Sequence, residues 1–265
     1  MDHYVSPGGR VPVSDFAPIV RIPPKSDNPS GAGAPCRSLH VVYRLGLLSS
    51  RAVSMIVTLD GPGGTGKSTV SRVVAQRAGL PHLDTGAFYR AATLAVIDAG
   101  VDASDREAVA DVVSGVTMKQ ESGRMYLDGK EVSSEIRGEA VTANVSAISA
   151  HPEVRRFLVG LQRAWIDEHG GGVVEGRDIG SVVFPDAAVK VFLSASPEVR
   201  AKRRAMETGE DLRDVLADLN RRDQLDSTRA ASPLTVPHGA VTIDTSELTF
   251  DEVVDQLLEL IRAKS

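Results

Sequence analysis

The chain has 265 residues, of which 42% are hydrophobic, and this is enough for one full core and an additional subdomain. Its 30 basic and 35 acidic residues give a net charge of −5, which argues against a protein that coats a nucleic acid or an anionic membrane. The single cysteine, Cys36, cannot form an internal disulfide or build a zinc site, and no apolar run reaches the roughly 18 residues of a membrane span. We therefore expect a cytoplasmic protein with neither a membrane nor a nucleic-acid partner.

Residues 1–54 differ in kind from the rest of the chain. They hold seven of the fourteen prolines and show no apolar period from which an element could be built. The segment lacks the apolar core of a secretory signal, although its few acidic residues would be compatible with a transit peptide. We expect a disordered N-terminal extension, or a misassigned start, that is dispensable for catalysis, with Met55 as the functional first residue.

The following segment alternates short apolar runs with helical periods, as a parallel α/β sheet does. Residues 55–60 predict a buried strand, which a glycine-rich turn joins to a helix that ends at Gly79. Residues 81–85 predict a short strand and residues 86–100 a second helix. Together these elements form one βαβα module.

The sequence pattern changes over residues 102–150, and we interpret this segment as an inserted subdomain. Alternating segments flank possible turns at Ser122-Gly123 and Asp128-Gly129, and this pattern predicts a hairpin.

The second half of the chain returns to the α/β alternation. It predicts a long amphipathic helix after Pro152, strands at 171–176 and 187–194, a helix opened by Ser196-Pro197, a last strand at 240–245, and a terminal helix with the capping box Thr249-x-x-Glu252.

A phosphate-binding loop is the strongest motif in the chain. Residues 61–68 match the pattern G-x-x-x-x-G-K-S between a predicted strand and a predicted helix. In such a loop the backbone N–H groups turn toward phosphate oxygens, and the helix N-terminus adds a positive end. We expect Lys67 to reach the β- and γ-phosphates of ATP and Ser68 to ligate Mg²⁺. The whole expected donor set is Gly61, Pro62, Gly63, Gly64, Thr65, Gly66, Lys67, Ser68 and Thr69.

Two classes of P-loop protein fit the sequence poorly. A GTPase would carry the guanine-reading pattern Asn-Lys-x-Asp, and no asparagine here precedes a lysine. A motor ATPase would carry an acidic strand end, and the segment GGVVEGRD offers only Glu175 and Asp178, with a glycine and an arginine between them. A small-molecule kinase remains.

Arginines recur at the ends of predicted elements. Arg90 lies one turn into a helix, Arg177 and Asp178 follow a strand, and Arg222 and Arg229 are seven residues apart on one helix face. Because α/β sheets open their ligand crevice at the carboxyl ends of the strands, these arginines together predict a second phosphate site beside the P-loop.

Five segments occur in the order and spacing of one known family: DGPGGTGKST, LDTGAFYR, EGRDIGSVVFPDAAVKVFL, RAKRRAMET and RRDQLDSTRA. From Met55 onward, over about 210 residues, the chain resembles bacterial cytidylate kinases. The resemblance implies a P-loop nucleoside-monophosphate (NMP) kinase fold of class α/β, with a five-stranded parallel sheet wrapped by helices. It also implies that the insert binds the NMP, that residues of about 200–213 form a short lid, and that the enzyme is a monomer acting on small nucleotides.

The same resemblance implies roles for the acceptor-side residues. Matching motifs assign Arg90, Arg177 and Arg229 to the phosphate of the acceptor, and Thr85 stands where the family often has serine, which keeps the hydroxyl. The remaining matches are Ser146, Arg155 and Asp178 for the cytosine edge, with Ser149 as the alternative to Ser146, and Arg222 and Asp226 for the ribose.

The lid matches Arg200, Arg203 and Arg204, which in that family close over ATP. For Arg200, a charge on the helix surface is the alternative interpretation. The residues expected to act in catalysis are Lys67, Arg177, Arg222 and Arg229.

The acceptor chemistry that these arginines suit needs no general base. A phosphate monoester, whose second pKa is near 6, is already ionised at neutral pH, whereas an alcohol needs a carboxylate to take its proton. The reaction requires charge cancellation between two anions and in-line positioning, which the arginines, Lys67 and Mg²⁺ can supply. The implied reaction is phosphoryl transfer from ATP to CMP or dCMP, giving ADP and CDP or dCDP.

Other functions stay open at this stage. The acceptor could be UMP or AMP, or a small alcohol such as shikimate with Asp84 as the base. A non-catalytic nucleotide-binding protein is the alternative outside the enzymes.

Overall fold

The computed structural model describes residues 55–229 and 232–264. The predictions about residues 1–54 therefore lie outside the described residues. Within the described part, no helix combines the length and the apolar character that crossing a bilayer requires.

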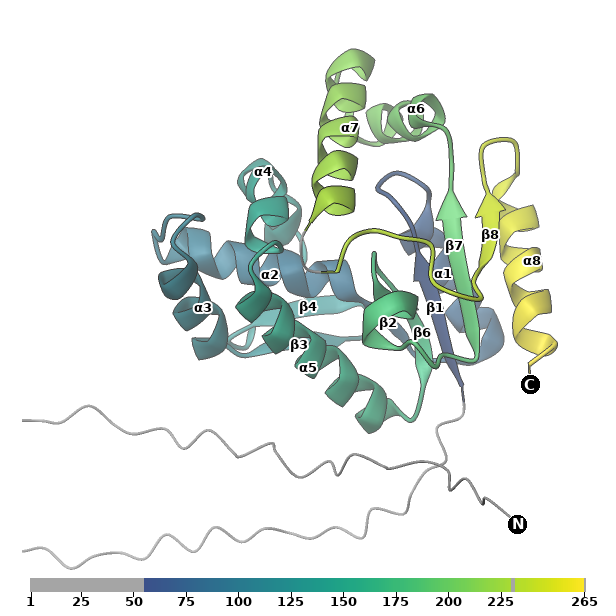
Figure 1. The fold of residues 1–265 in the computed structure, drawn as a ribbon, viewed down its shortest axis with the longest axis horizontal. Helices are drawn as coiled ribbons and strands as arrows, with labels where there is room; N and C mark the ends of the chain where they lie inside the picture. The colour runs from purple at the N-terminus through teal and green to yellow at the C-terminus, as the bar shows by residue number, and fades with distance from the viewer. Residues whose placement is uncertain (1–54, 230–231, 265) are drawn as a thin grey trace, which may run out of the picture. The chain divides into compact units, whose positions relative to one another are not determined.

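A five-stranded parallel sheet forms the centre of the fold (Figure 1). Its spatial order is β2-β6-β1-β7-β8, and all four pairings between neighbours are parallel. The predicted five-stranded sheet is thus confirmed. The strands are β1 (Ile56–Asp60), β2 (His82–Asp84), β6 (Gly172–Glu175), β7 (Val189–Ser194) and β8 (Val241–Asp244).

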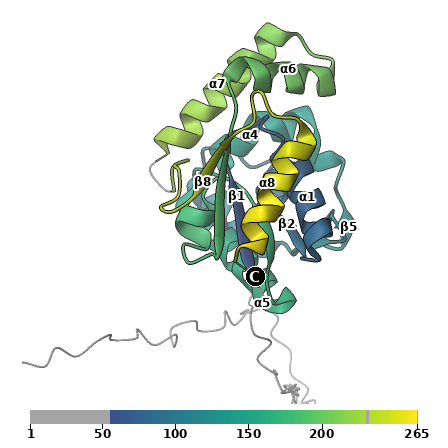
Figure 2. The same cartoon turned by 90° about the vertical axis from the view of Figure 1, so that its right-hand side faces the viewer.

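Helices cover both faces of this sheet, which explains why consecutive residues of the central strands β1 and β6 are buried, rather than every second one. On one face, α1 and α8 lie side by side over Val57 and Leu59 of β1 (Figure 2). On the other face, α2 and α5 pack with the insert against Leu83 and Val174. The helices are α1 (Lys67–Ala78), α2 (Thr85–Asp98), α5 (Pro152–His169), α6 (Pro197–Thr208), α7 (Leu212–Thr228) and α8 (Phe250–Arg262).

The helix ends follow the sequence signals. Gly79 ends α1 with φ 66, in the left-handed region that favours glycine. The capping box of α8 is formed in both directions, because Glu252 donates its N–H to Thr249 Oγ1 and accepts from the N–H of Thr249.

The insert contains more helices and strands than the sequence predicted. Both predicted turns are present, with Ser122 and Asp128 each at φ 49, followed by Gly123 and Gly129 at positive φ, as in the mirror-image turns that suit hairpins. The prediction of one hairpin was incomplete, because a third short strand of the insert pairs with the second strand of that hairpin. The insert contains α3 (Arg106–Gly115), β3 (Met118–Glu121), β4 (Arg124–Leu127), β5 (Lys130–Glu131), the 3₁₀ helix η1 (Glu135–Arg137) and α4 (Glu139–Ile148).

Helices α6 and α7 stand above the carboxyl ends of the strands (Figure 1). They pack on each other through Ala201, Val215 and Leu219. The predicted lid, residues 200–213, comprises most of α6, the turn at Gly209 and the start of α7.

Candidate active site

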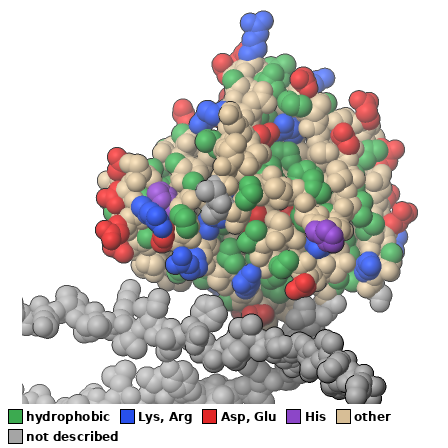
Figure 3. All heavy atoms as spheres, in the orientation of Figure 1, with side chains coloured by type: hydrophobic (Ala, Val, Ile, Leu, Met, Phe, Trp, Pro, Cys, Tyr) green, Lys and Arg blue, Asp and Glu red, His purple; other side chains and the backbone are tan. Residues whose placement is uncertain are grey.

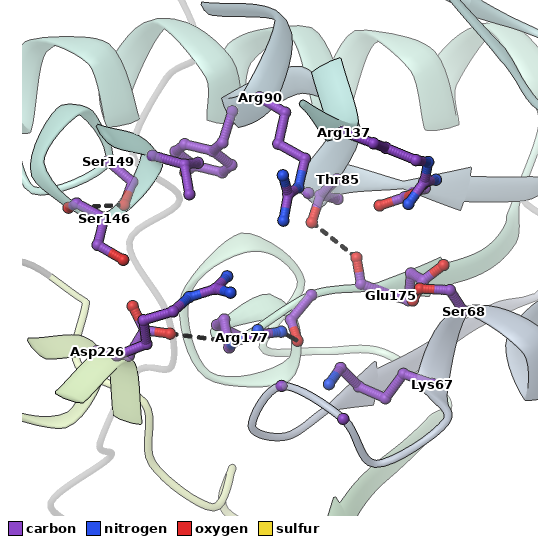
Figure 4. Close-up of a pocket in the computed structure, with 18 of the residues that line it drawn as sticks. Lys67, Ser68, Thr85, Arg90, Arg137, Ser146, Ser149, Glu175, Arg177 and Asp226 are labelled. Atoms are coloured by element: carbon purple, nitrogen blue, oxygen red, sulfur yellow. Dashed lines mark hydrogen bonds and ion pairs between the residues drawn. The ribbon is translucent and has the colours of Figure 1, made fainter. Parts of the chain in front are cut away.

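A cavity of about 600 Å³ opens at the carboxyl ends of β1, β2 and β6 (Figure 4). Its walls come from the P-loop, α2, the insert, α5, the end of β6 and α7. The sequence-predicted residues that line it are Gly63, Gly64, Gly66, Lys67, Ser68, Thr69, Thr85, Arg90, Ser146, Arg155, Arg177, Asp178, Arg204, Arg222, Asp226 and Arg229. The motifs that the sequence spreads over about 170 residues therefore meet in one place.

The P-loop adopts a shape that only glycine permits at its first position. Gly61 has φ 144, and a Cβ there would lie 2.1 Å from the carbonyl oxygen of Leu193 in the adjacent strand. The loop runs to Gly66, which has φ 83 and caps α1. This geometry leaves the first N–H groups of α1 facing the cavity, as anion binding requires.

Lys67 is buried at the floor of the cavity. Its Nζ donates to the carbonyl of Pro62 at 2.5 Å and to Thr65 Oγ1 at 3.3 Å, and within the described part of the chain no carboxylate forms an ion pair with it. Burial lowers the pKa of Lys67 well below its ordinary value, and the nearby charge of Arg177 lowers it further. A bound anion would supply the partner that this cation lacks.

Ser68 faces a carboxylate that the sequence analysis had set aside. Ser68 Oγ donates at 2.8 Å to Glu175 Oε2, because Glu175 ends β6 directly beside Leu59 of β1. His82 Nε2 lies 3.2 Å from the other carboxylate oxygen, Oε1. Although burial acts to raise the pKa of Glu175, the hydrogen bonds of His82 and Ser68 hold it below the ordinary value. The glycine and arginine that follow Glu175 in GGVVEGRD weakened the match to a Walker-B strand end, yet Glu175 does stand at the end of β6 beside Ser68.

Arginines crowd the opposite wall. The guanidinium of Arg90 donates to the carbonyl of Ile136 at 3.1 Å and to Thr142 Oγ1 at 3.0 Å. Burial and the neighbouring charges of Arg222 and Arg137 lower the pKa of Arg90 to about 10. Placing these positively charged side chains close together costs electrostatic free energy, and a polyanion bound in the cavity would offset this cost.

A single carboxylate is shared by two further arginines. Arg177 Nε donates to Asp226 Oδ2 at 3.2 Å, and Arg229 lies 3.6 Å from Asp226 Oδ1. Burial lowers the pKa of Arg229, as it does that of Arg222. On the molecular face shown in Figure 3, by contrast, basic and acidic side chains are interspersed rather than gathered by sign.

The third group of residues surrounds Arg155, which is 5% exposed. Its guanidinium forms an ion pair with Asp178, donates at 3.3 Å to the carbonyl of Ser149, and lies over the ring of Tyr89 at 5.3 Å from the centroid. The Ser149 hydroxyl is used locally, because it donates at 3.1 Å to the carbonyl of Ser146. In Figure 4 the Ser146 hydroxyl points into the cavity, which favours Ser146 over Ser149 as the residue available to a ligand.

Comparison with known proteins now decides the family. The family model described as cytidylate kinase matches residues 57–263. The chain belongs to the cytidylate kinase family. The resemblance drawn from the five motifs is thereby confirmed.

Relatives of similar length support the assignment to the cytidylate kinase family. The chain is 51% identical over 216 residues to a cytidylate kinase of Mycobacterium leprae, covering 80% of this chain and 97% of that protein. It is 51% identical over 221 residues to one from Rhodococcus opacus, covering 80% and 96%, and 50% identical over 223 residues to one from Corynebacterium glutamicum, covering 81% and 97%.

The position of Arg200 in this member of the cytidylate kinase family differs from the alternative interpretation of a charge on the helix surface. It is 4% exposed, so the alternative of a helix-surface charge is wrong. The guanidinium donates at 3.2 Å to the carbonyl of Gly63 and at 2.5 Å to Asp223 Oδ2, and its Nε donates to the carbonyl of Ala195. Arg200 thus lies behind the P-loop, where it ties the loop to α7, and it does not line the main cavity.

Arg203 lies in a second, smaller cavity of about 230 Å³ on the outer side of the P-loop. It donates at 3.0 Å to Thr245 Oγ1 and at 2.6 Å to the carbonyl of the same residue. Thr65, Gly66, Thr69 and Phe250 also line this cavity. The predicted ATP-binding residues Gly61 and Pro62 line neither cavity. Gly61 packs closely against the carbonyl oxygen of Leu193, and the carbonyl of Pro62 accepts from Lys67 Nζ.

Among the residues of the main cavity that were not anticipated are one tyrosine and two arginines. Tyr89 lies beneath Arg155, Arg72 comes from the exposed side of α1, and Arg137 comes from η1 of the insert, 3.8 Å from Asp84 Oδ2. Tyr89 could have been found, since it stands within LDTGAFYR beside Arg90. Arg137 follows two hairpins in a segment without a motif, and nothing in the sequence marked it.

Proposed function

We propose that the protein catalyses phosphoryl transfer from ATP to CMP or dCMP, giving ADP and CDP or dCDP. The observation that carries the proposal is the presence of two anion-binding groups in one cavity: the P-loop with Lys67, and the facing arginines Arg90, Arg177 and Arg229. Membership of the cytidylate kinase family and the names of the relatives support the choice of acceptor.

The donor would lie across both cavities. The β- and γ-phosphates would bind the P-loop N–H groups and Lys67, and the adenosine end would extend over Gly66 toward Arg203 and Thr245 in the second cavity. Arg204, which lines the main cavity, is the lid arginine nearest to the place where phosphate would be transferred. Arg200 would act from behind, by holding the carbonyl of Gly63.

The residues present suit Mg²⁺, a hard cation that prefers oxygen ligands and usually retains waters and nucleotide phosphates. Ser68 and Glu175 would hold it, because the hydrogen bond from Ser68 Oγ to Glu175 Oε2 places a hydroxyl oxygen and a buried carboxylate side by side. In the described residues no three His, Cys, Asp or Glu side chains form a metal cage, which agrees with an ion held partly by the nucleotide. The ion would neutralise charge on the β- and γ-phosphates.

Replacing Glu175 with glutamine is expected to raise the Mg²⁺ concentration for half-maximal activity by about tenfold or more, because one charged oxygen is lost beside Ser68. The measurement is a Mg²⁺ titration at saturating ATP and CMP. The matched control is Asp84→Asn, an acidic residue of the same cavity whose Oδ1 accepts from Ala87 N as the cap of α2. An equal shift in both variants would assign the effect to general charge loss and contradict a specific role of Glu175.

Arg90, Arg177 and Arg229 would hold the acceptor phosphate, and the Thr85 hydroxyl would lie at its edge. Since that phosphate is already ionised near neutral pH, no side chain has to remove a proton from it. The protein would contribute charge cancellation and in-line alignment of the acceptor oxygen with the γ-phosphorus.

The cytosine and the ribose would occupy the far end of the cavity. Arg155, Asp178 and Ser146 would read the base, and Arg222 and Asp226 would hold the sugar. This part of the proposal is supported by the buried pair of Arg155 with Asp178, a donor and an acceptor fixed side by side.

The proposal extends to the larger units. Residues 102–150 would act as the NMP-binding subdomain and residues 200–213 as a lid whose closure excludes water and so limits ATP hydrolysis. We infer a working monomer in the cytoplasm with small nucleotides as its partners; the monomer is supported by the donor and acceptor groups of the main cavity, which all come from one chain.

The test is an assay of ADP release with ATP and Mg²⁺, run in parallel with CMP, dCMP, UMP, AMP and shikimate. We expect turnover with CMP and dCMP, and a kcat/KM at least about 100-fold lower for the others, because a site that hydrogen-bonds one base leaves buried groups unpaired with another. Turnover of another nucleotide would overturn the base assignment alone. Turnover of shikimate only would overturn the phosphate-acceptor assignment and make Asp84 the base.

A further inference from the structure

Asp60 is a buried carboxylate that the reaction proposed above does not use. It is the last residue of β1, it directly precedes the P-loop, and it is 0% exposed. No Lys, Arg or His in the described ranges forms an ion pair with it. Instead its two oxygens accept from two backbone N–H groups: Ile179 N donates to Oδ1 and Gly180 N to Oδ2, each at 2.7 Å.

These two N–H groups open the π-helix η2 (Ile179–Val183), a rare element that occurs often at functional sites. The approach is close, since a Cβ on Gly180 would lie 2.7 Å from Thr58 Oγ1 and 3.2 Å from Asp60 Oδ2. At the other end of η2, Arg163 donates to the carbonyls of Val182 and Val183. The short π-helix is therefore held at both ends, and the Asp60 end is buried.

The residues just before η2 are Arg177 and Asp178, which line the main cavity, whereas Asp60 is followed at once by Gly61 of the P-loop. One carboxylate thus joins the loop on the donor side to the segment on the acceptor side. The strand that carries Asp60 is paired with β6 and β7 on both sides, so that loss of the two hydrogen bonds from Asp60 would affect η2 rather than the strand.

We propose that Asp60 is a positioning residue that fixes Arg177 and Asp178 relative to the P-loop and thereby sets the alignment of the CMP phosphate with ATP. This inference rests on the proposed function, because it assigns Arg177 and Asp178 to the acceptor. The carboxylate form suits the role, since an ionised carboxylate presents both oxygens as acceptors to the two N–H groups.

The buried environment of Asp60 disfavours the ionised form of its carboxylate. Burial raises the pKa of Asp60 to about 6, against the lowering effect of the two N–H groups; Asp178 raises it further and Lys67 lowers it. At the slightly alkaline pH of a kinase assay both oxygens accept.

The experiment compares Asp60→Asn with Thr58→Ala in the full chain. Asparagine turns an N–H donor toward one of the two backbone N–H groups, so that one of the two hydrogen bonds is lost. We expect kcat/KM for CMP to fall on the order of 10- to 100-fold, with a raised KM for CMP and a KM for ATP changed less than about threefold, because misplacement of the acceptor groups by 1 Å is enough for such a loss. Hydrogen exchange at the amides of Ile179 and Gly180 should become faster.

Thr58→Ala is the matched control, since Thr58 is on the same strand and sheet face, is also 0% exposed, and has a hydroxyl without a hydrogen-bond partner. It should leave both KM values and the exchange of η2 unchanged. Gly180→Ala, which pushes η2 away from the other side, should reproduce the pattern of Asp60→Asn.

Three outcomes would overturn the inference: equal effects of Asp60→Asn and Thr58→Ala, an equal rise of both KM values, or faster exchange of η2 with unchanged CMP kinetics. If Asp60→Asn does not fold, Gly180→Ala decides by the same readouts. Failure of the wild-type protein to phosphorylate CMP would instead overturn the proposed function and with it the acceptor role on which the inference rests, whereas the exchange measurement would still report whether Asp60 holds η2.

Discussion

Replacing Lys67 with alanine is expected to lower kcat by about 10²- to 10³-fold while the dissociation constant for CMP stays within about twofold. Lys67 is the buried cation of the P-loop, oriented toward the loop by Pro62 and Thr65. In the proposed function Lys67 faces the place where charge would develop between the β- and γ-phosphates, whereas Arg155 and Asp178 would read the base. The loss should therefore fall on turnover rather than on acceptor binding.

The fold should tolerate the Lys67→Ala change. Because burial lowers the pKa of Lys67, its protonated form costs free energy of folding at neutral pH, and this cost disappears only as the pH rises above the folded-state pKa. We expect a melting temperature at pH 7.5 that is not lower than that of the wild type. Steady-state kinetics and CMP titration calorimetry, with exposed Lys264→Ala as the control, measure the effect. Turnover by Lys67→Ala equal to that of the wild type would contradict the assignment of Lys67 to the β- and γ-phosphates of ATP.

Replacing Arg177 with alanine is expected to lower kcat/KM for CMP by about 10³-fold, with KM raised and kcat lowered together. Arg177 lies close to the P-loop: its Nε donates to Asp226, and its Nη2 lies 3.6 Å from the position of a Cβ on Gly63. It also contributes to the lowered pKa of Lys67. A guanidinium in this place would bind the acceptor phosphate in the ground state and the transferred group in the transition state, so both constants should change.

The matched control for Arg177 is Arg221→Ala. The Arg221 side chain is 57% exposed on α7, and among the described residues it pairs, at 2.5 Å, only with Asp218 on the same helix, an arrangement of small energetic value. We expect its kinetic constants to stay within about twofold of the wild type. A loss confined to kcat in Arg177→Ala, with KM unchanged, would contradict a role in binding the acceptor.

Much of this architecture could be predicted because its signals are local. Buried parallel strands read as short apolar runs, and Lys67 could be placed because the P-loop pattern stands between such a run and a helical period. The arginines could be grouped because the carboxyl ends of parallel strands share one edge of the sheet. In the structure Arg90 and Arg177 do line one cavity.

The failures concern features that depend on what packs from elsewhere. Arg200 lies in a polar stretch that reads as surface, yet the P-loop and α7 bury it. Glu175 did not fit a sequence pattern, but the pairing of β6 with β1 puts its carboxylate on Ser68. The two-residue strand β5 is too short to show a period, and Asp60 became meaningful only when the N–H groups of Ile179 and Gly180 were found against it.

The position of α8 after all the residues of the main cavity has a consequence for protein synthesis. By Arg229, a growing chain on the ribosome already contains every residue that lines the main cavity. Yet α8 still has to cover α1, and Phe250 and Val253 still have to close the second cavity. A product that ends early, or is clipped by a protease before α8, would keep all its arginines and its P-loop sequence but would expose the apolar face of α1, including Val70 and Val74. The second cavity thus depends on α8, which is synthesised after every residue of the main cavity.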